Sequence, residues 1–303
     1  MHFPKIPIHF KIGTKVFKGI LCKLSYLNVT ETVSNHFFFF RAGKTFRIYI
    51  LIPLLPAFEG DIASHTTGNA LRTILHFNYI SICRGSDSLL KQIQSHGINP
   101  VNYVSFCSLR QHAEILGMPV TELIYIHSKL MIIDDKIVIC GSANINDRSL
   151  LGSRDSEVAL ILEDQEFTEG QMNGKNCPSG KLAGKLRMEL MKEHLGIADL
   201  NAVKDCISDT FYKDVWLRRA AKNTKLFDET FLCIPTDEVK NMEENLKYLI
   251  QRPLAETDKF AANQKIREIQ GYLVLLPLLY LENENLSPSV FVKEGMVPTI
   301  TWT

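Results

Sequence analysis

The stretch over residues 124–157 constrains the fold more than any other part of this sequence. Residues 123–133 are rich in β-branched and aliphatic side chains, which predicts a strand. The turn Asp134-Asp135-Lys136 then predicts a reversal into a second buried run that ends at Gly141. A third apolar run follows at residues 158–162. We therefore expect a β-hairpin with a neighbouring strand in the middle of the chain.

Polar residues occur in this hairpin at a fixed spacing, H-x-K-x4-D followed by G-S-x-N, namely His127, Lys129, Asp134, Gly141, Ser142 and Asn144. The two-residue period of a strand would place His127 and Lys129 on the same face. An imidazole beside a fixed cation suits chemistry on a phosphate, because the cation stabilises charge on the oxygens while the imidazole attacks or transfers a proton. We expect the hairpin to return Ser142 and Asn144 towards the level of His127, where they would donate hydrogen bonds to phosphate oxygens.

Two carboxylates near this pattern each have two interpretations. Glu157 could accept a hydrogen bond from the second imidazole nitrogen and fix its tautomer, or it could join an ion network with Arg154 and Asp155. Asp134 could contact the substrate or have a purely structural role in the turn. For His127 alone a satisfied core histidine would be the default, and its joint spacing with Lys129, Asp134, Ser142 and Asn144 favours a functional site.

The pattern resembles the HKD motif of the phospholipase D superfamily. The string GSANINDRSLLGSRDSE is similar to the second HKD motif of eukaryotic phosphatidylcholine-hydrolysing members, and PLLPAFEGDI, GNALRTILHFNY and VPTITWT look like other parts of their C-terminal half. The resemblance covers residues 35–303. It implies an α/β fold in which a mixed β-sheet is flanked by helices, as one half of the pseudo-symmetric phospholipase D fold. It also implies that Trp302 and Thr303 support the site.

The activity implied by the resemblance is hydrolysis of phosphatidylcholine to phosphatidate and choline through a phosphohistidine intermediate. Family members build one active site from two HKD motifs, and this chain shows one, because His9-Phe10-Lys11 has Val16 where the motif has aspartate. His127 is then expected to act as general acid and afterwards as base, with no metal or other cofactor. The second half could come from another chain or a homodimer; alternatively, the chain is a catalytically silent regulatory module.

The composition of the chain indicates which classes of binding partner to expect. A formal net charge of +1 disfavours nucleic acid. The apolar runs are too short to cross a bilayer, so we expect peripheral contact with phosphatidylcholine membranes. Seven cysteines without a C-x-x-C pair, and no signal peptide, indicate the cytoplasmic side. Residues 1–34 carry five lysines before Glu31 and are interpreted as a segment of uncertain structure, either a membrane-surface or targeting peptide or a poorly structured terminus.

Hydrophobic periodicity and helix-starting or helix-ending residues predict further secondary structure. We expect strands at 47–53, 102–109 and 272–276, helices at 70–82, from residue 87 or 88 to Gly97, and at 181–195, and helical regions at 209–222 and at 239–269 with a break at Pro253. Residues 163–180 are expected to form a polar loop.

Overall fold

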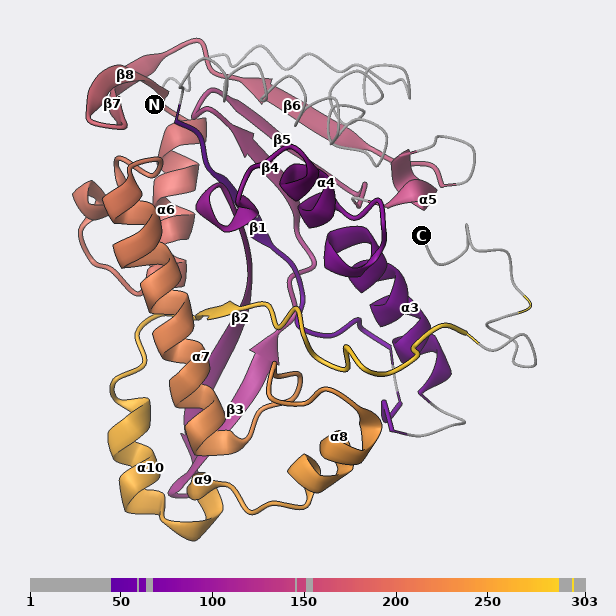
Figure 1. Cartoon of the computed structure of the whole chain (residues 1–303). Helices are drawn as coiled ribbons and strands as arrows, with labels where there is room; N and C mark the ends of the chain where they lie inside the picture. Colours follow the sequence, from indigo (N-terminus) through magenta and orange to yellow (C-terminus); the bar gives the residue numbers. More distant parts are fainter. Residues whose placement is uncertain are drawn as a thin grey trace. The chain divides into compact units, whose positions relative to one another are not determined.

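The computed structural model describes residues 45–58, 60–63, 68–144, 146–150, 155–288 and 296 (Figure 1). Within this part the chain divides into two compact units. Unit 1 contains Ser128–Leu190, and unit 2 contains Phe46–His127 and the chain from Met191 onward. The predicted segment 1–34, Arg154, Trp302 and Thr303 lie outside the described residues.

Unit 2 is built on a mixed sheet, as the sequence predicts. Strand β1 (Ile48–Leu51) pairs in parallel with β2 (Val104–Ile115), with Ile48 opposite Val104. On β2, the strands β3 (Met118–Ile124) and β9 (Leu273–Leu275) pair antiparallel. The first seven residues of β2 are almost all buried, as expected for a strand covered on both faces.

The helices of unit 2 largely follow the predicted periodicity. They are α3 (Asn69–Tyr79) with a π-helical continuation (Ile80–Arg84), α4 (Leu89–Ser95), a π-helical segment (Thr210–Leu217) that continues into α7 (Arg218–Phe231), α8 (Met242–Leu249), α9 (Leu254–Thr257) and α10 (Lys259–Ile266). Two short 3-10 helices lie at Pro100–Asn102 and Leu200–Val203. Ser88 is the N-cap of α4, and Pro253, where a break was predicted, is the N-cap of α9.

Helix α7 lies along the sheet of unit 2 and contacts β9 and β3, while α9 and α10 contact β3 (Figure 1). The buried core of this layer contains Leu226, Phe227, Ile266, Val274 and Leu276. The expectation of a mixed sheet flanked by helices is therefore confirmed.

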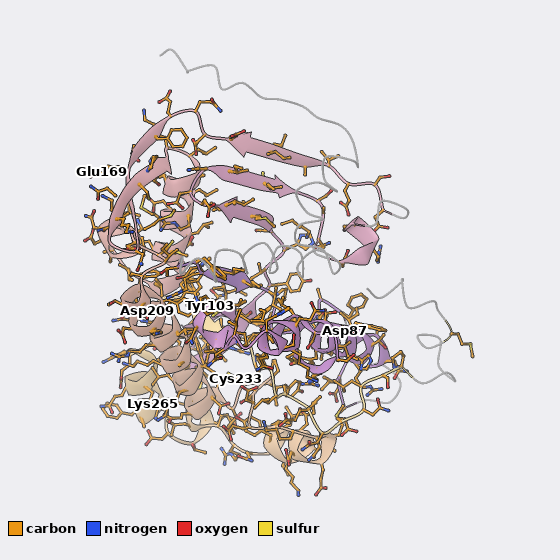
Figure 2. The ribbon with its side chains drawn as sticks, turned by 45° about the horizontal axis from the view of Figure 1, so that its top comes forward. Asp87, Tyr103, Glu169, Asp209, Cys233 and Lys265 are labelled. Carbon is orange, nitrogen blue, oxygen red and sulfur yellow. The ribbon has the colours of Figure 1, made fainter. Side chains whose placement is uncertain are left out.

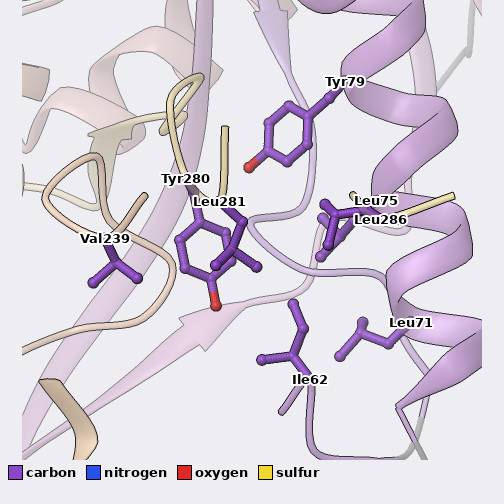
Figure 3. Packing of buried hydrophobic residues seen from close by; sticks show 8 residues of the cluster. All are labelled: Ile62, Leu71, Leu75, Tyr79, Val239, Tyr280, Leu281 and Leu286. Atoms are coloured by element: carbon purple, nitrogen blue, oxygen red, sulfur yellow. The ribbon is translucent and has the colours of Figure 1, made fainter. Parts of the chain in front are cut away.

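A second core in unit 2 joins α3 to the chain after β9 (Figure 3). It consists of Ile62, Leu71, Leu75, Tyr79, Val239, Tyr280, Leu281 and Leu286. Arg84 fixes this packing, because its guanidinium donates to the carbonyls of Leu278 at 3.2 Å, Tyr280 at 2.6 Å and Leu281 at 3.3 Å. The same guanidinium lies 3.8 Å from the ring centroid of Tyr79.

The start of β1 is held by a cation between two aromatic rings. The guanidinium of Arg47 lies 5.6 Å from the ring centroid of Tyr103 and 4.9 Å from that of Tyr212. Arg47 also forms an ion pair with Asp209; Tyr103 and Asp209 are labelled in Figure 2. Its buried position between rings is a common way to place an arginine at the edge of a core.

Unit 1 contains an antiparallel sheet in the order β4 (Lys129–Ile133), β5 (Ile137–Gly141) and β6 (Ala159–Glu163), with the short helix α5 (Asp147–Leu150) before β6. A second hairpin follows, with β7 (Phe167–Met172) and β8 (Lys175–Gly180). Helix α6 (Ala183–Leu195) begins in unit 1.

Two predictions about these elements are wrong. Residues 123–133 do not form one strand, because β3 ends at Ile124 and β4 begins at Lys129. Residues 163–180 do not form a loop, because Asn173-Gly174 makes a tight turn in which both residues have positive φ, 51° and 75°. Asn-Gly is the preferred pair for such hairpin turns.

Candidate active site

Lys129 occupies the first position of β4 and begins a row of three residues across the sheet of unit 1. Its partner in β5 is Gly141, and the partner of Gly141 in β6 is Ala159. A Cβ atom on Gly141 would overlap with the carbonyl oxygen of Val158 and lie 2.6 Å from the Cα of Ala159. Glycine is therefore required here by close approach of the neighbouring backbone.

Ser142 and Glu157 lie directly beyond this row and contact each other. The Ser142 hydroxyl donates to Oε2 of Glu157 at 2.5 Å and accepts the backbone N–H of Val158 at 3.0 Å. The backbone N–H of Ser142 donates to the carbonyl of Val158 at 2.9 Å. These three bonds join the ends of β5 and β6, and they engage one carboxylate oxygen of Glu157. The expected bond from the imidazole of His127 to Glu157 stays a prediction.

Asn144 lies in the loop between β5 and α5, and its backbone is fixed from within that loop. Its N–H donates to Oγ of Ser149 at 3.2 Å, and the N–H of Ser149 donates to Oδ1 of Asn146 at 3.0 Å. Arg148 forms an ion pair with Asp155 at 3.0 Å. The side chain of Asn144 is exposed.

His127 lies in the four-residue connection between β3 and β4. Its ring stacks on that of Tyr125, with centroids 6.1 Å apart and an angle of 30° between the planes, and the residue is exposed. The strand period therefore does not apply to His127 and Lys129, and the argument that placed both on one strand face is corrected. The two Cα atoms are still within about 7 Å because only one residue separates them.

Asp134 lies at the opposite end of the hairpin from Lys129 and Ser142. The register runs from Lys129↔Gly141 to Ile133↔Ile137, and Asp134 follows in the turn. A strand of this length separates the turn from Gly141 by about 14 Å. Asp134 is exposed and has φ of 50°, a conformation that aspartate tolerates better than most residues. Of the two roles considered for Asp134, this geometry supports the structural one.

The neighbouring Asp135 is a residue that sequence reasoning missed. It is only 5% exposed, although it is a carboxylate in a turn. Arg187 of α6 donates to it twice, from Nε to Oδ1 at 2.8 Å and from Nη2 to Oδ2 at 2.6 Å, and Ser179 of β8 donates to Oδ2 at 3.1 Å. The available signal was Arg187 itself, which shares a helix face with the buried Ala183 and Met191.

Two features are absent from the described part of the chain. In the described ranges, no group of three or more histidine, cysteine, aspartate or glutamate side chains could hold a metal ion. No helix among the described residues has both the length and the apolar character needed to cross a membrane.

The described sheets and helices form an α/β fold. Residues 110–238 match the family model described as Phospholipase D. The whole chain is 49% identical to phospholipase D1 of Rattus norvegicus over 306 residues and 40% identical to phospholipase D2 of Bos taurus over 308 residues. Over 81% of the chain it is 38% identical to phospholipase D zeta 2 of Arabidopsis thaliana. The chain belongs to the phospholipase D superfamily. It spans 28% of the length of the rat relative, 32% of the bovine one and 25% of the plant one.

Proposed function

We propose that the chain supplies one half of a phospholipase D active site that hydrolyses phosphatidylcholine to phosphatidate and choline. The observation that carries this proposal is the placement of Lys129, Gly141 and Ser142 at one end of a single hairpin, directly after His127. A lysine at this position can neutralise a nonbridging phosphate oxygen, and Gly141 beside it lets β6 pack closely against β5.

In the proposed reaction a histidine of the second half attacks phosphorus and forms a phosphohistidine, while His127 donates a proton to the departing choline oxygen. His127 then takes a proton from water, and the resulting attack releases phosphatidate and the free histidine. Lys129 holds the phosphate throughout, and the Asn144 amide donates to its oxygens. Glu157 orients the imidazole and supports Ser142. The paired lysines of the two halves supply the positive charge, so the proposed chemistry needs no metal.

The second half is proposed to come from another chain or from a second copy of this one. Support comes from the single complete HKD motif in this sequence, because a site of two motifs needs a second one. We further propose that the protein acts at the surface of phosphatidylcholine membranes from the cytoplasmic side. A net charge of +1 gives little attraction for nucleic acid.

Transphosphatidylation tests this proposal. The purified chain is incubated with phosphatidylcholine vesicles and a primary alcohol, with and without an N-terminal half that carries a first HKD motif. The variants are His127→Asn and Lys129→Met, and Lys136→Met is the matched control because Lys136 is exposed in the turn at the far end of the hairpin. We expect phosphatidyl alcohol from the unmodified chain and from the control, and none from the two site variants.

The origin of the product separates the alternatives. Product from the chain alone supports a homodimer, and product on complementation alone supports a split enzyme. Absence of product in both conditions, from a folded chain, contradicts the proposal and supports the silent regulatory module.

A further inference from the structure

The turn of the β4–β5 hairpin is bound to the rest of unit 1 by both side-chain and backbone hydrogen bonds. Asp135 binds Arg187 through both carboxylate oxygens and Ser179 through one. Its backbone carbonyl accepts the N–H of Gly180 at 2.7 Å, and the carbonyl of Lys136 accepts the N–H of Asp164 at 2.9 Å. The turn is thus bound by β8, by α6 and by the residue that follows β6.

Glycines bring these elements close around Asp135. A Cβ on Gly184, in the first turn of α6, would overlap with Oγ of Ser179 and lie 3.4 Å from the Cβ of Asp135. A Cβ on Gly180 would overlap with the carboxylate of Asp164 and lie 2.7 Å from the carbonyl oxygen of Asp135. Asp164 in turn accepts the backbone N–H of Ala183 at 2.7 Å at the start of α6. A larger side chain at Gly184 would displace the hydroxyl that binds Asp135, and one at Gly180 would also press on the backbone carbonyl of Asp135.

The ion pair between Asp135 and Arg187 fixes the orientation of the hairpin turn relative to α6 as well as its distance from α6. Both side chains are nearly buried, with exposed fractions of 6% and 9%, so removal of one partner would leave an uncompensated charge. A bidentate arginine–carboxylate pair is planar and has a narrow range of geometries. An apolar residue at position 135 could fill the space, but it would not set the angle at which the turn leaves α6.

The hairpin connects this anchor to the candidate site without interruption. Five consecutive pairs run from Ile133↔Ile137 to Lys129↔Gly141, and the middle of β5 is buried, with Val138 2% and Ile139 5% exposed. A packed ladder of this kind does not bend freely over its length of about 14 Å. A shift of the turn is therefore passed on to Lys129 and Ser142.

We propose that Asp135 and Arg187 are positioning residues of the active site, which set the placement of Lys129 and Ser142 through the β4–β5 hairpin. This inference rests on the proposed function for its catalytic meaning. The motif aspartate, Asp134, does not have this role.

Amide hydrogen exchange of the purified chain tests the coupling without any need for activity. The reporter is the N–H of Ser142, which donates to the carbonyl of Val158 at the site end of the hairpin. The N–H of Gly180 reports on the anchor, and that of Arg110, which donates to the carbonyl of Tyr272, reports on unit 2. The variants are Asp135→Asn and Ser179→Ala, with Asp134→Asn as the matched control.

We expect Asp135→Asn to accelerate exchange at Ser142 at least tenfold, with Arg110 unchanged. Ser179→Ala, which keeps the ion pair and removes one neutral bond, should give a smaller acceleration at both Gly180 and Ser142, and Asp134→Asn should give none. Faster exchange at Gly180 with unchanged exchange at Ser142, in either anchor variant, would overturn the inference. If Asp135→Asn does not fold, the comparison of Ser179→Ala with Asp134→Asn decides the question.

Activity gives the second readout, measured with the second half present. Positioning predicts that Ser179→Ala lowers kcat several-fold and leaves the KM for vesicles unchanged, because phosphate orientation and not membrane binding is disturbed. An unchanged kcat in this variant would contradict the catalytic meaning of the anchor. If the unmodified chain forms no product at all, the proposed function fails, whereas the exchange result still decides whether anchor and site end are coupled.

Discussion

Lys129 and Gly141 are direct partners across the β4–β5 ladder, and no side chain other than that of Lys129 extends from this pair. The third residue of the row, Ala159, has only a methyl group. Lys129 thus has glycine opposite it in the ladder, and alanine lies one strand further across the sheet.

Replacement of Gly141 by alanine is predicted to destabilise unit 1. The new methyl group would overlap with the carbonyl oxygen of Val158, so β5 and β6 must separate. We expect a loss of about 2–3 kcal/mol in the free energy of unfolding, measured by chemical denaturation. Gly174→Ala is the control, because that glycine has φ of 75° but nothing within 4 Å of the added Cβ. Backbone strain alone should cost about 1 kcal/mol there; equal losses at both positions would contradict the steric argument.

Asp134 is predicted to tolerate substitution by a residue suited to positive φ. Asp134→Asn should change stability by less than about 0.5 kcal/mol and leave product formation with the second half unchanged. Asp134→Val should cost about 1–2 kcal/mol, because a β-branched side chain is unfavourable at φ of 50°. Thermal unfolding and initial rates check both variants. A large loss of activity in a folded Asp134→Asn chain would show that Asp134 has more than a structural role.

Two substitutions distinguish the roles of Ser142 and Glu157. Ser142→Ala removes the hydroxyl that joins Glu157 to the N–H of Val158 and should cost about 1 kcal/mol of stability. Glu157→Gln keeps an acceptor for that hydroxyl but loses the charge. If Glu157 orients the imidazole of His127, the glutamine variant keeps its stability and loses activity by roughly tenfold or more. Full activity of Glu157→Gln would limit Glu157 to the support of Ser142.

Asp228 of α7 is predicted to make unfolding pH-dependent. Burial raises the pKa of its carboxyl, against the hydrogen bond from Tyr248, which lowers it. With the folded pKa above the unfolded one, the contribution of this group to stability is present below the unfolded pKa and is lost as pH rises through the folded pKa. We therefore expect the free energy of unfolding of Asp228→Asn, relative to that of the unmodified chain, to be higher at pH 7 than at pH 4. Chemical denaturation at both pH values measures this difference.

Asp209 is the matched control for this measurement. The hydrogen bond from Lys213, with Arg47 beside it, lowers the pKa of the Asp209 carboxyl, so its contribution is present above the unfolded pKa and is lost as pH falls through the folded one. We expect the free energy of unfolding of Asp209→Asn, relative to that of the unmodified chain, to be lower at pH 7 than at pH 4. The same sign of change in both variants would contradict the assignment.

The parts of the fold that sequence reasoning predicted correctly depend on local signals. Two apolar runs around Asp134-Asp135-Lys136 are sufficient for a hairpin, and Ser88 and Pro253, residue types typical of helix starts and breaks, directly precede α4 and α9. By contrast, the break after Ile124 has no local signal. Apolar residues continue beyond it, and the strand ends there because β3 pairs with β2 whereas β4 pairs with β5.

Two further differences have separate causes. The Asn173-Gly174 turn was visible in the sequence, but its flanks are polar because the first three residues of β7 are exposed, so composition favoured a loop. The burial of Asp135 could not be predicted from the turn, since either of two consecutive aspartates fits it. The choice depends on Arg187, 52 residues later in the chain.

Arg84 binds carbonyls that follow it by 194 to 197 residues. During synthesis, α3 therefore leaves the ribosome long before the segment that covers its apolar side has been translated. A polypeptide terminated before Leu278 would lack every carbonyl that this guanidinium binds in unit 2, and Leu71, Leu75 and Tyr79 would remain accessible to chaperones and proteases. For this unit, folding must wait until nearly all of its sequence has been made.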